Sequence, residues 1–252
     1  MMKRARLIIQ ILSFLVFAVC AVYLSKYFYD NYNAKSDIAQ LQSIAAEDKG
    51  SGAEESYAEN GMLSEYYELY QRNGDMVGWI RIADTSIDYP VMYRNDDNEY
   101  YLHRNFDKEY SYSGLPFMDK DCDLAKPGDN LIIYGHNMKS GLMFAPLLKY
   151  ENENYLSEHR EIEFDTMYKR EKYRIISVFR TQVGSQHEFK YYNFTDSHSE
   201  EDFDNFTDAV KKLSLYNIDE SAAYGDKLLT LSTCSYDSDD ERFVVVAKKI
   251  SK

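Results

Sequence analysis

Cysteine and glycine are scarce in this chain, whose 252 residues include only 3 cysteines and 11 glycines. The glycines are too few for a glycine-rich loop that cradles phosphate, and no G-x-x-x-x-G-K-[ST] sequence is present. No internal repeat is present either, which argues against a repeat architecture. Since 44% of the residues are hydrophobic, the chain is still able to bury one substantial core. We therefore expect a single domain of enzyme size with short appendages.

Positive charge is also in short supply. The 29 Lys and Arg residues are outnumbered by 42 Asp and Glu residues, and the formal net charge is −13. Such a surface repels phosphate backbones, so nucleic acid is not an expected partner. The acidic run at residues 237–241 lacks the alternation and the ligating glutamate of an EF-hand loop. Neither a metal nor another cofactor is therefore expected.

The N-terminus holds a long apolar run, Leu7 to Leu24. As a helix that rises ~1.5 Å per residue it reaches about 27 Å, close to the ~30 Å core of a bilayer. It is longer than the apolar region of a cleaved signal peptide, about 7–15 residues, and the AVC at residues 18–20 is a poor cleavage site. Cleavage, or lipidation of that cysteine, is the alternative. We predict a signal anchor at residues 7–24, with the basic residues 1–6 in the cytoplasm and the rest of the chain outside.

Residues 25–61 have the composition of a stalk. Few large apolar residues occur between Ser36 and Gly61, and the sequence KGSG lies in the middle of that range. We expect the stalk to be partly helical and then flexible. It should separate the membrane segment from the domain, with few contacts across it.

The remaining domain, residues 62–252, is predicted to be mostly β. It opens on a helical segment, MLSEYYELYQRNGD, whose leucine and tyrosines recur at helical spacing. The pattern then changes to short β-rich runs bounded by Gly, Pro, Asp and Asn. These runs are VGWIRI, SIDYPVM, GLPFMD, NLIIYGHN, IEFDTM, EKYRIISVFRTQV, KLLTLSTC and RFVVVAKKI. They predict a mostly antiparallel barrel or sandwich.

One amphipathic helix interrupts the strands. The segment SEEDFDNFTDAVKKLSLYN places Phe203, Phe206, Val210 and Leu213 on one helical face, and Ser199 precedes it as an N-cap. Acids in the first turn and lysines near the end complement the helix dipole. We expect the aromatic face to pack onto the barrel, near the strand that follows.

That strand ends at Cys234, and Arg242 opens the next one. Period-two alternation in KLLTLSTC places the cysteine at the end of a face that becomes polar, as the floor of a groove would be. A hairpin brings the end of one strand beside the start of the next, so thiol and guanidinium can meet. Each residue also has a plainer interpretation that stays open. In the first, Cys234 forms a disulfide with Cys122. In the second, Arg242 forms an ion pair with the acidic run between the strands.

A thiol nucleophile needs a base or a proton donor, and the five histidines differ in their surroundings. His159, His187 and His198 lie in polar stretches typical of a surface, and His103 lies among aromatics on an expected short helix. His136 follows the apolar strand LIIYG, where a buried strand reaches the surface. A histidine satisfied at a strand end is the alternative for it.

TLSTC with an arginine that opens the next strand, YGHNM at the end of an earlier strand, and ELYQRNGDMVGWIRIADTSIDYPVM together resemble a class B sortase, a membrane-anchored transpeptidase of Gram-positive cell walls. The resemblance runs from about residue 62 to 250 and implies a sortase-type closed β-barrel with a leading helix and an inserted helix. It also implies Cys234 as nucleophile, His136 as its proton-transfer partner and Arg242 as the oxyanion residue. The same resemblance leaves Cys122 reduced and unpaired.

The resemblance further implies the reaction and its partners. Sortases cut the C-terminal sorting signal of a surface protein after threonine, hold it as a thioacyl-enzyme and pass it to a peptidoglycan amine. Class B members act on signals of the NPQTN or NPxTG kind. The matching substrate-binding positions are Ser232, Asn98 and Leu102, with local capping as the alternative for Asn98 and ordinary packing for Leu102.

Two other functions stay open at this point. One is an extracellular cysteine endopeptidase, although such enzymes usually place cysteine at a helix start ahead of the histidine. The other is an anchored binding module without catalysis, in which Cys122 and Cys234 form a disulfide.

Overall fold

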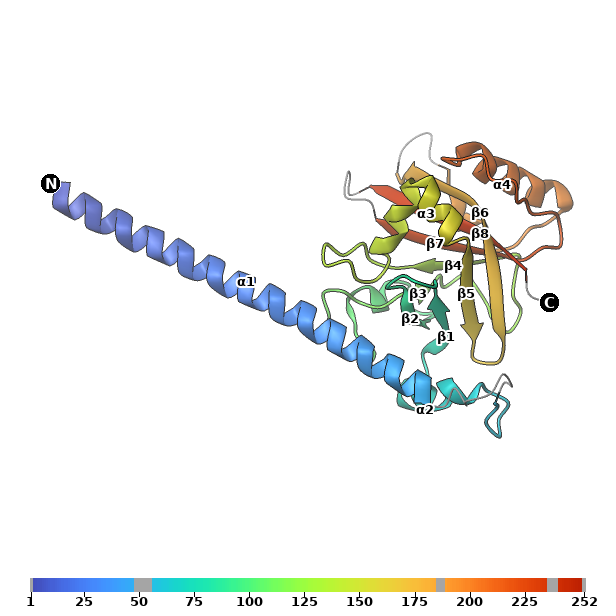
Figure 1. The fold of residues 1–252 in the computed structure, drawn as a ribbon, viewed down its shortest axis with the longest axis horizontal. Helices are drawn as coiled ribbons and strands as arrows, with labels where there is room; N and C mark the ends of the chain where they lie inside the picture. Colours follow the sequence, from blue (N-terminus) through green and yellow to red (C-terminus); the bar gives the residue numbers. More distant parts are fainter. Residues whose placement is uncertain (1, 48–55, 185–188, 235–239, 251–252) are drawn as a thin grey trace.

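The structure is a computed structural model that describes residues 2–47, 56–184, 189–234 and 240–250. Within these ranges eight strands form a closed barrel in the order β1-β2-β3-β4-β7-β8-β6-β5 (Figure 1). Their bounds are Met76–Arg81 (β1), Asp88–Met92 (β2), Phe117–Met118 (β3), Asn130–Tyr134 (β4), Glu161–Thr166 (β5), Arg170–Gln182 (β6), Leu228–Cys234 (β7) and Glu241–Lys249 (β8). Each predicted β-rich run overlaps one of these strands, and the prediction of a mostly β closed barrel is confirmed.

Helices and short 3₁₀ segments connect the strands. The α-helices are α1 (Met2–Glu47), α2 (Ser64–Arg72), α3 (Glu153–Glu158) and α4 (Glu200–Leu213), and the 3₁₀ segments are η1 (Tyr100–His103), η2 (Ala145–Glu151) and η3 (Tyr191–Asn193). The predicted leading helix is α2, where Tyr66 is fully buried and stacks on Trp79 of β1 with ring centroids 5.9 Å apart. This stacking fixes the leading helix against the barrel.

Strands β7 and β8 are covered on both faces. Alternate residues point into the barrel core, and the others pack outward against α4 and η3. The inward residues are Leu229, Leu231, Phe243, Val245 and Ala247, and the outward residues are Leu228, Val244 and Val246. The strand that carries the cysteine is therefore held rigidly from two sides.

Helix α4 is the predicted inserted helix, and it packs on β6 as expected (Figure 1). The side chain of Ser199 accepts a hydrogen bond from the backbone N–H of Asp202 at 3.2 Å, which confirms the cap. Phe203, Phe206 and Val210 are buried. Leu213 is 40% exposed, so its assignment to the buried face is wrong. It is the last residue of the helix, and the N–H of Leu215 just after it donates to the carbonyl of Val178 in β6 at 2.8 Å.

Helix α1 has two different halves. It is continuous from Met2 to Glu47 and projects away from the barrel at its N-terminal end (Figure 1). Its N-terminal part is exposed, whereas Ala34, Ile38, Leu41 and Ala45 are buried against the domain. The C-terminal part of the stalk therefore docks on the domain, which the sequence did not indicate, whereas none of residues 7–24 belongs to the buried core. Two of these four buried residues are alanines, whose small side chains give little hydrophobic signal in the sequence.

Candidate active site

Cys234 and Arg242 lie opposite each other across the β7–β8 pair. Cys234 is the last residue of β7, and its Cα faces that of Arg242 in an antiparallel register that extends back to Leu228. Opposite Cα atoms in such a pair are about 4.5 to 5.5 Å apart. The predicted pairing of the two strand ends is confirmed, while the side chain of Cys234 and residues 235–239 lie outside the described part of the structure.

His136 lies level with them, one strand further along the barrel. β4 runs parallel to β7 with Tyr134 beside Ser232, and the N–H of Gly135 donates to the carbonyl of Ser232 at 3.1 Å. The ladder thus continues past the end of β4. Two residues beyond the Tyr134–Ser232 pair stand His136 and Cys234. The end of the barrel therefore brings the three predicted catalytic positions onto neighbouring strands.

A backbone carbonyl holds the imidazole of His136. Nε2 of its ring lies 2.8 Å from the carbonyl oxygen of Leu102, in η1. A carbonyl only accepts, so Nε2 carries the hydrogen and Nδ1 is the nitrogen that gains and loses a proton. The sequence pointed to the side chain of Leu102, which packs half-buried against the core. No sequence pattern marks a carbonyl, and this role of Leu102 was missed.

The pKa of His136 is lowered below its ordinary value. Burial is the largest cause, the hydrogen bond to Leu102 opposes it, and positive charge on His103 lowers the pKa further. The His103 ring lies 5.3 Å from the His136 ring, centroid to centroid. The expected short helix under His103 is confirmed as η1, but its proximity to His136 was not foreseen. The lowered pKa favours the neutral imidazole of His136 at pH 7.

The chain requires a glycine just before His136. A Cβ on Gly135 would lie 2.7 Å from Cγ of Phe144, whose side chain is fully buried. The N–H of Phe144 also donates to the carbonyl of His136 at 2.8 Å. The aromatic ring therefore packs directly against the strand end that carries the histidine. The glycine of the YGHN sequence was the available signal for this contact.

Arg242 is half-buried, and its Nη1 donates to the carbonyl of Glu241 at 3.1 Å. The carboxylate of Glu241 forms an ion pair with Arg180 of β6, which also pairs with Glu151 of η2. The alternative of an ion pair between Arg242 and the acidic run falls mostly on residues outside the described ranges. A guanidinium at this position offers planar donors suited to an anionic oxygen.

The polar face of β7 is not an open groove floor at Thr230 and Ser232. Ser232 is 1% exposed, and its Oγ lies 2.6 Å from the hydroxyl oxygen of Tyr191 in η3. Thr230 is 0% exposed and donates to Oδ1 of Asn130 at 2.9 Å. The groove interpretation is therefore wrong for these two residues, since η3 and β4 satisfy their hydroxyls internally. A substrate contact at Ser232 stays a prediction.

Asn98 contacts a segment distant in sequence. Its Oδ1 accepts a hydrogen bond from the backbone N–H of Lys120 at 2.9 Å, 22 residues along the chain, so this contact is not the local cap of the alternative. The side chain is half-buried and precedes η1, which contributes the carbonyl to His136. A contact between Asn98 and substrate stays a prediction.

Cys122 is a free, buried thiol. It contacts β4, where its Sγ accepts from the N–H of Ile132 at 3.4 Å and donates to the carbonyl of Asn130 at 3.6 Å. Burial raises its pKa to about 12, so it is neutral and unreactive. In the β4–β7 register Ile132 pairs with Thr230, four residues from Cys234. That is about 13 Å along a strand, more than a disulfide spans.

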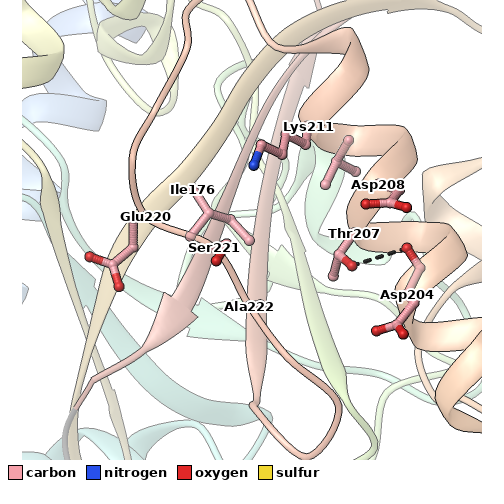
Figure 2. A pocket seen from close by; sticks show the side chains of 9 residues that line it. Ile176, Asp204, Thr207, Asp208, Lys211, Glu220, Ser221 and Ala222 are labelled. Carbon is pink, nitrogen blue, oxygen red and sulfur yellow. Dashed lines mark hydrogen bonds between the residues drawn. The ribbon is translucent and has the colours of Figure 1, made fainter.

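Two hollows of the structure lie away from these residues. One of about 300 Å³ is bounded by α4 and residues 220–222, with Asp204, Lys211 and Glu220 on its rim (Figure 2). The other, of about 540 Å³ and mostly apolar, lies at the end of the barrel where β7 begins. Neither His136 nor Arg242 is among the described residues that line these two hollows.

Comparisons with known proteins give a consistent result. A family model described as "Sortase domain" matches residues 80–250. Sortase B of Listeria monocytogenes is 36% identical over 190 residues, which is 75% of each protein. Sortase B from B. anthracis in complex with AAEK1 superposes with a TM-score of 0.76 and 32% identity, covering 89% of this chain and 100% of that one. A Staphylococcus aureus sortase B–substrate complex superposes with a TM-score of 0.78 and 29% identity, covering 88% and 98%.

Proposed function

Since the chain belongs to the class B sortases and is a cysteine transpeptidase, we propose that it cleaves a C-terminal sorting signal of the NPQTN or NPxTG kind after threonine. It then transfers the surface protein to a peptidoglycan amine. The observation that carries this proposal is the placement of His136, Cys234 and Arg242 at one level of three neighbouring strands.

The first half-reaction forms a thioacyl-enzyme. The thiolate of Cys234 attacks the threonine carbonyl, so a C–S bond forms and the carbonyl oxygen becomes an oxyanion. The guanidinium of Arg242 stabilises that oxygen with its fixed donors. The C–N bond then breaks, and the imidazolium of His136 gives its Nδ1 proton to the departing amine.

The second half-reaction releases the acyl group to a new amine. Neutral His136 takes a proton from the incoming amine through Nδ1, and the amine nitrogen attacks the thioester carbonyl. A C–N bond forms, the C–S bond breaks, and Cys234 leaves as the thiolate. Because burial lowers the pKa of His136, this base form predominates at pH 7. The acid form needed first is scarce until an anionic thiolate lies beside it.

The decisive experiment separates transfer from hydrolysis. The full chain in detergent micelles is incubated with a peptide library of NPxT[GN] variants, with and without triglycine or a diaminopimelate-containing peptide. Mass spectrometry should show the product moving from free acid to amide as amine is added, and hydroxylamine should release a hydroxamate. If no amine alters the product ratio while hydrolysis runs at full rate, the cysteine-endopeptidase alternative takes the place of this proposal.

We further propose that residues 7–24 anchor the enzyme, with residues 1–6 cytoplasmic, residues 25–61 as a stalk and residues 62–252 as the catalytic domain outside. α1 is a helix long and apolar enough to cross a membrane. Deleting residues 1–24 should give a soluble protein that cleaves peptide, because that part of α1 makes no contribution to the domain core. Aggregation or inactivity of this truncation would show that the boundary is wrong.

A further inference from the structure

We propose that Asp75 and Tyr101 are positioning residues for His136, acting through the carbonyl of Leu102. The inference rests on the proposed function in that His136 transfers protons there. Asp75 precedes β1, and Tyr101 lies in η1, so the pair joins the rigid barrel to the segment that holds the imidazole.

The Leu102 carbonyl is confined on its far side by Gly114. Gly114 has φ +55°, and a Cβ on it would lie 2.2 Å from that carbonyl oxygen and 2.5 Å from the carbonyl oxygen of Tyr101. The same Leu102 oxygen accepts from Nε2 of His136 at 2.8 Å. Since backbone closely surrounds this oxygen, a shift of η1 moves the acceptor and with it the imidazole. A misplacement of about 1 Å at a reacting group costs on the order of a hundredfold in rate.

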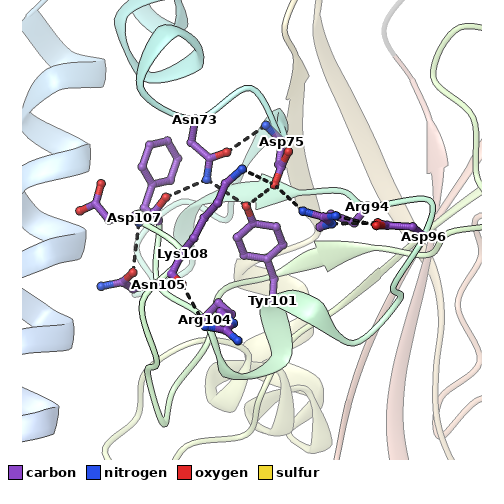
Figure 3. Close-up of polar contacts among 10 residues, drawn as sticks. Asn73, Asp75, Arg94, Asp96, Tyr101, Arg104, Asn105, Asp107 and Lys108 are labelled. Atoms are coloured by element: carbon purple, nitrogen blue, oxygen red, sulfur yellow. Dashed lines mark hydrogen bonds and ion pairs between the residues drawn. The ribbon is translucent and has the colours of Figure 1, made fainter.

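The side chain of Tyr101 also fixes η1. Its side chain is 1% exposed, and its hydroxyl donates to Oδ2 of Asp75 at 2.7 Å (Figure 3). The hydroxyl also accepts from Nδ2 of Asn73 at 2.9 Å. The Tyr101 carbonyl accepts from the N–H of Leu115 at 3.0 Å. Tyr101 is therefore held at both its ring end and its backbone, directly next to Leu102.

Asp75 is the charged centre of this cluster. Burial alone would raise its pKa, but hydrogen bonds from Tyr101 and Lys108, with the charges of Lys108 and Arg94, lower it below the usual value. Nζ of Lys108 lies 2.9 Å from Oδ2, and Nη1 of Arg94 lies 3.7 Å from it (Figure 3). The carboxylate thus remains an acceptor at neutral pH. Its own carbonyl accepts from the N–H of Tyr93 at 2.8 Å, which ties it to the end of β2.

A matched pair of variants tests the proposal. Tyr101→Phe and Tyr66→Phe each remove a hydrogen bond of 2.7 Å from a buried tyrosine to an aspartate Oδ2, but Tyr66 bonds to Asp165 on β5. Tyr101→Phe also removes the acceptor of Asn73 Nδ2, which keeps its hydrogen bond to the carbonyl of Phe106. In the full chain in micelles, Tyr101→Phe should lower kcat about tenfold at unchanged KM. Tyr66→Phe should leave kcat within about twofold. Equal effects of the two variants on kcat, or none from Tyr101→Phe, would overturn the proposal.

A second readout does not depend on turnover. In ¹⁵N-histidine-labelled full chain, NMR should find His136 of the unsubstituted protein as the Nε2–H tautomer, and Tyr101→Phe should yield a tautomer mixture. If the unsubstituted enzyme is inactive on every peptide while the tautomer still responds to Tyr101→Phe, the proposed function fails and the positioning role stands. Should Tyr101→Phe not fold, Asp75→Asn replaces it, and a pure Nε2–H tautomer in that variant contradicts the role.

Discussion

The two halves of the proposed active site are held in different ways. Cys234 and Arg242 stand in a continuous ladder of paired residues between β7 and β8, with both faces of these strands covered. His136 stands just beyond the end of β4, where its ring is held by one hydrogen bond to Leu102 and its backbone by one from Phe144, whose ring packs against Gly135. The half with Cys234 and Arg242, here called the ladder half, tolerates the loss of any single contact, because neighbouring residue pairs keep the strand register. The half with His136, here called the histidine half, depends on individual tertiary contacts.

The largest effect is expected in the ladder half, from removal of the nucleophile. Cys234→Ala should abolish cleavage and transfer, a loss of at least about a thousandfold in kcat, because no thioacyl can form. Cys122→Ala is the matched control, since that thiol is buried and neutral. Peptide turnover measured by chromatography distinguishes them. Normal turnover by Cys234→Ala would refute the assignment of the nucleophile.

The second largest effect is expected from Arg242→Lys, with a loss of about a hundredfold in kcat. One ammonium cannot reproduce the planar donors of a guanidinium around the oxyanion. The backbone ladder should be unaffected, so thermal unfolding followed by the fluorescence of the single tryptophan, Trp79, should not change. Retention of most activity would show that Arg242 acts only as a general positive charge.

In the histidine half, Gly135→Ala should lower kcat about tenfold to a hundredfold. The added Cβ meets the ring of buried Phe144 at 2.7 Å, so the strand end must shift and carry His136 with it. Gly74→Ala is the matched control, because its Cβ would find only one atom, Cζ of Tyr70, at 4.0 Å. Equal kinetics of the two variants would mean that His136 is not sensitive to this contact.

A smaller change is expected from His103→Gln. Loss of the nearby positive charge should raise the pKa of His136, since charged His103 lowers it. The lower-pH limb of the kcat/KM profile should therefore move to higher pH, and activity at pH 7 should change by less than about threefold. If the lower-pH limb does not move, the group that titrates in this limb is not His136.

The smallest effect on activity is expected outside both halves, in α1. Leu41→Ala should cost about 2–4 kcal/mol of unfolding free energy, because Leu41 is 1% exposed, while kcat stays within about twofold. Leu24→Ala should leave the stability of the domain unchanged, since Leu24 is 52% exposed. Denaturant unfolding monitored at Trp79 measures both. A similar stability for the two variants would mean that α1 does not dock on the domain in solution.

Local chemistry made much of this protein predictable. Alternating apolar residues with Gly, Pro, Asp and Asn at their ends identified the barrel strands, because side-chain period and turn preference are properties of short segments. The hairpin argument likewise placed Cys234 beside Arg242. The apolar run at residues 7–24 is equally visible, since hydrophobic length needs no partner to be recognised.

Tertiary structure alone decided the features that depend on a partner distant in sequence. Whether Ser232 faces water depends on Tyr191, and the orientation of the His136 ring depends on the carbonyl of Leu102. The docking of α1 through Ala34 and Ala45 depends on a complementary surface on the domain. A small or polar side chain has no intrinsic preference for burial that would predict such a contact from the local sequence. Its burial is favourable only when folding brings the matching donor, acceptor or cavity to it.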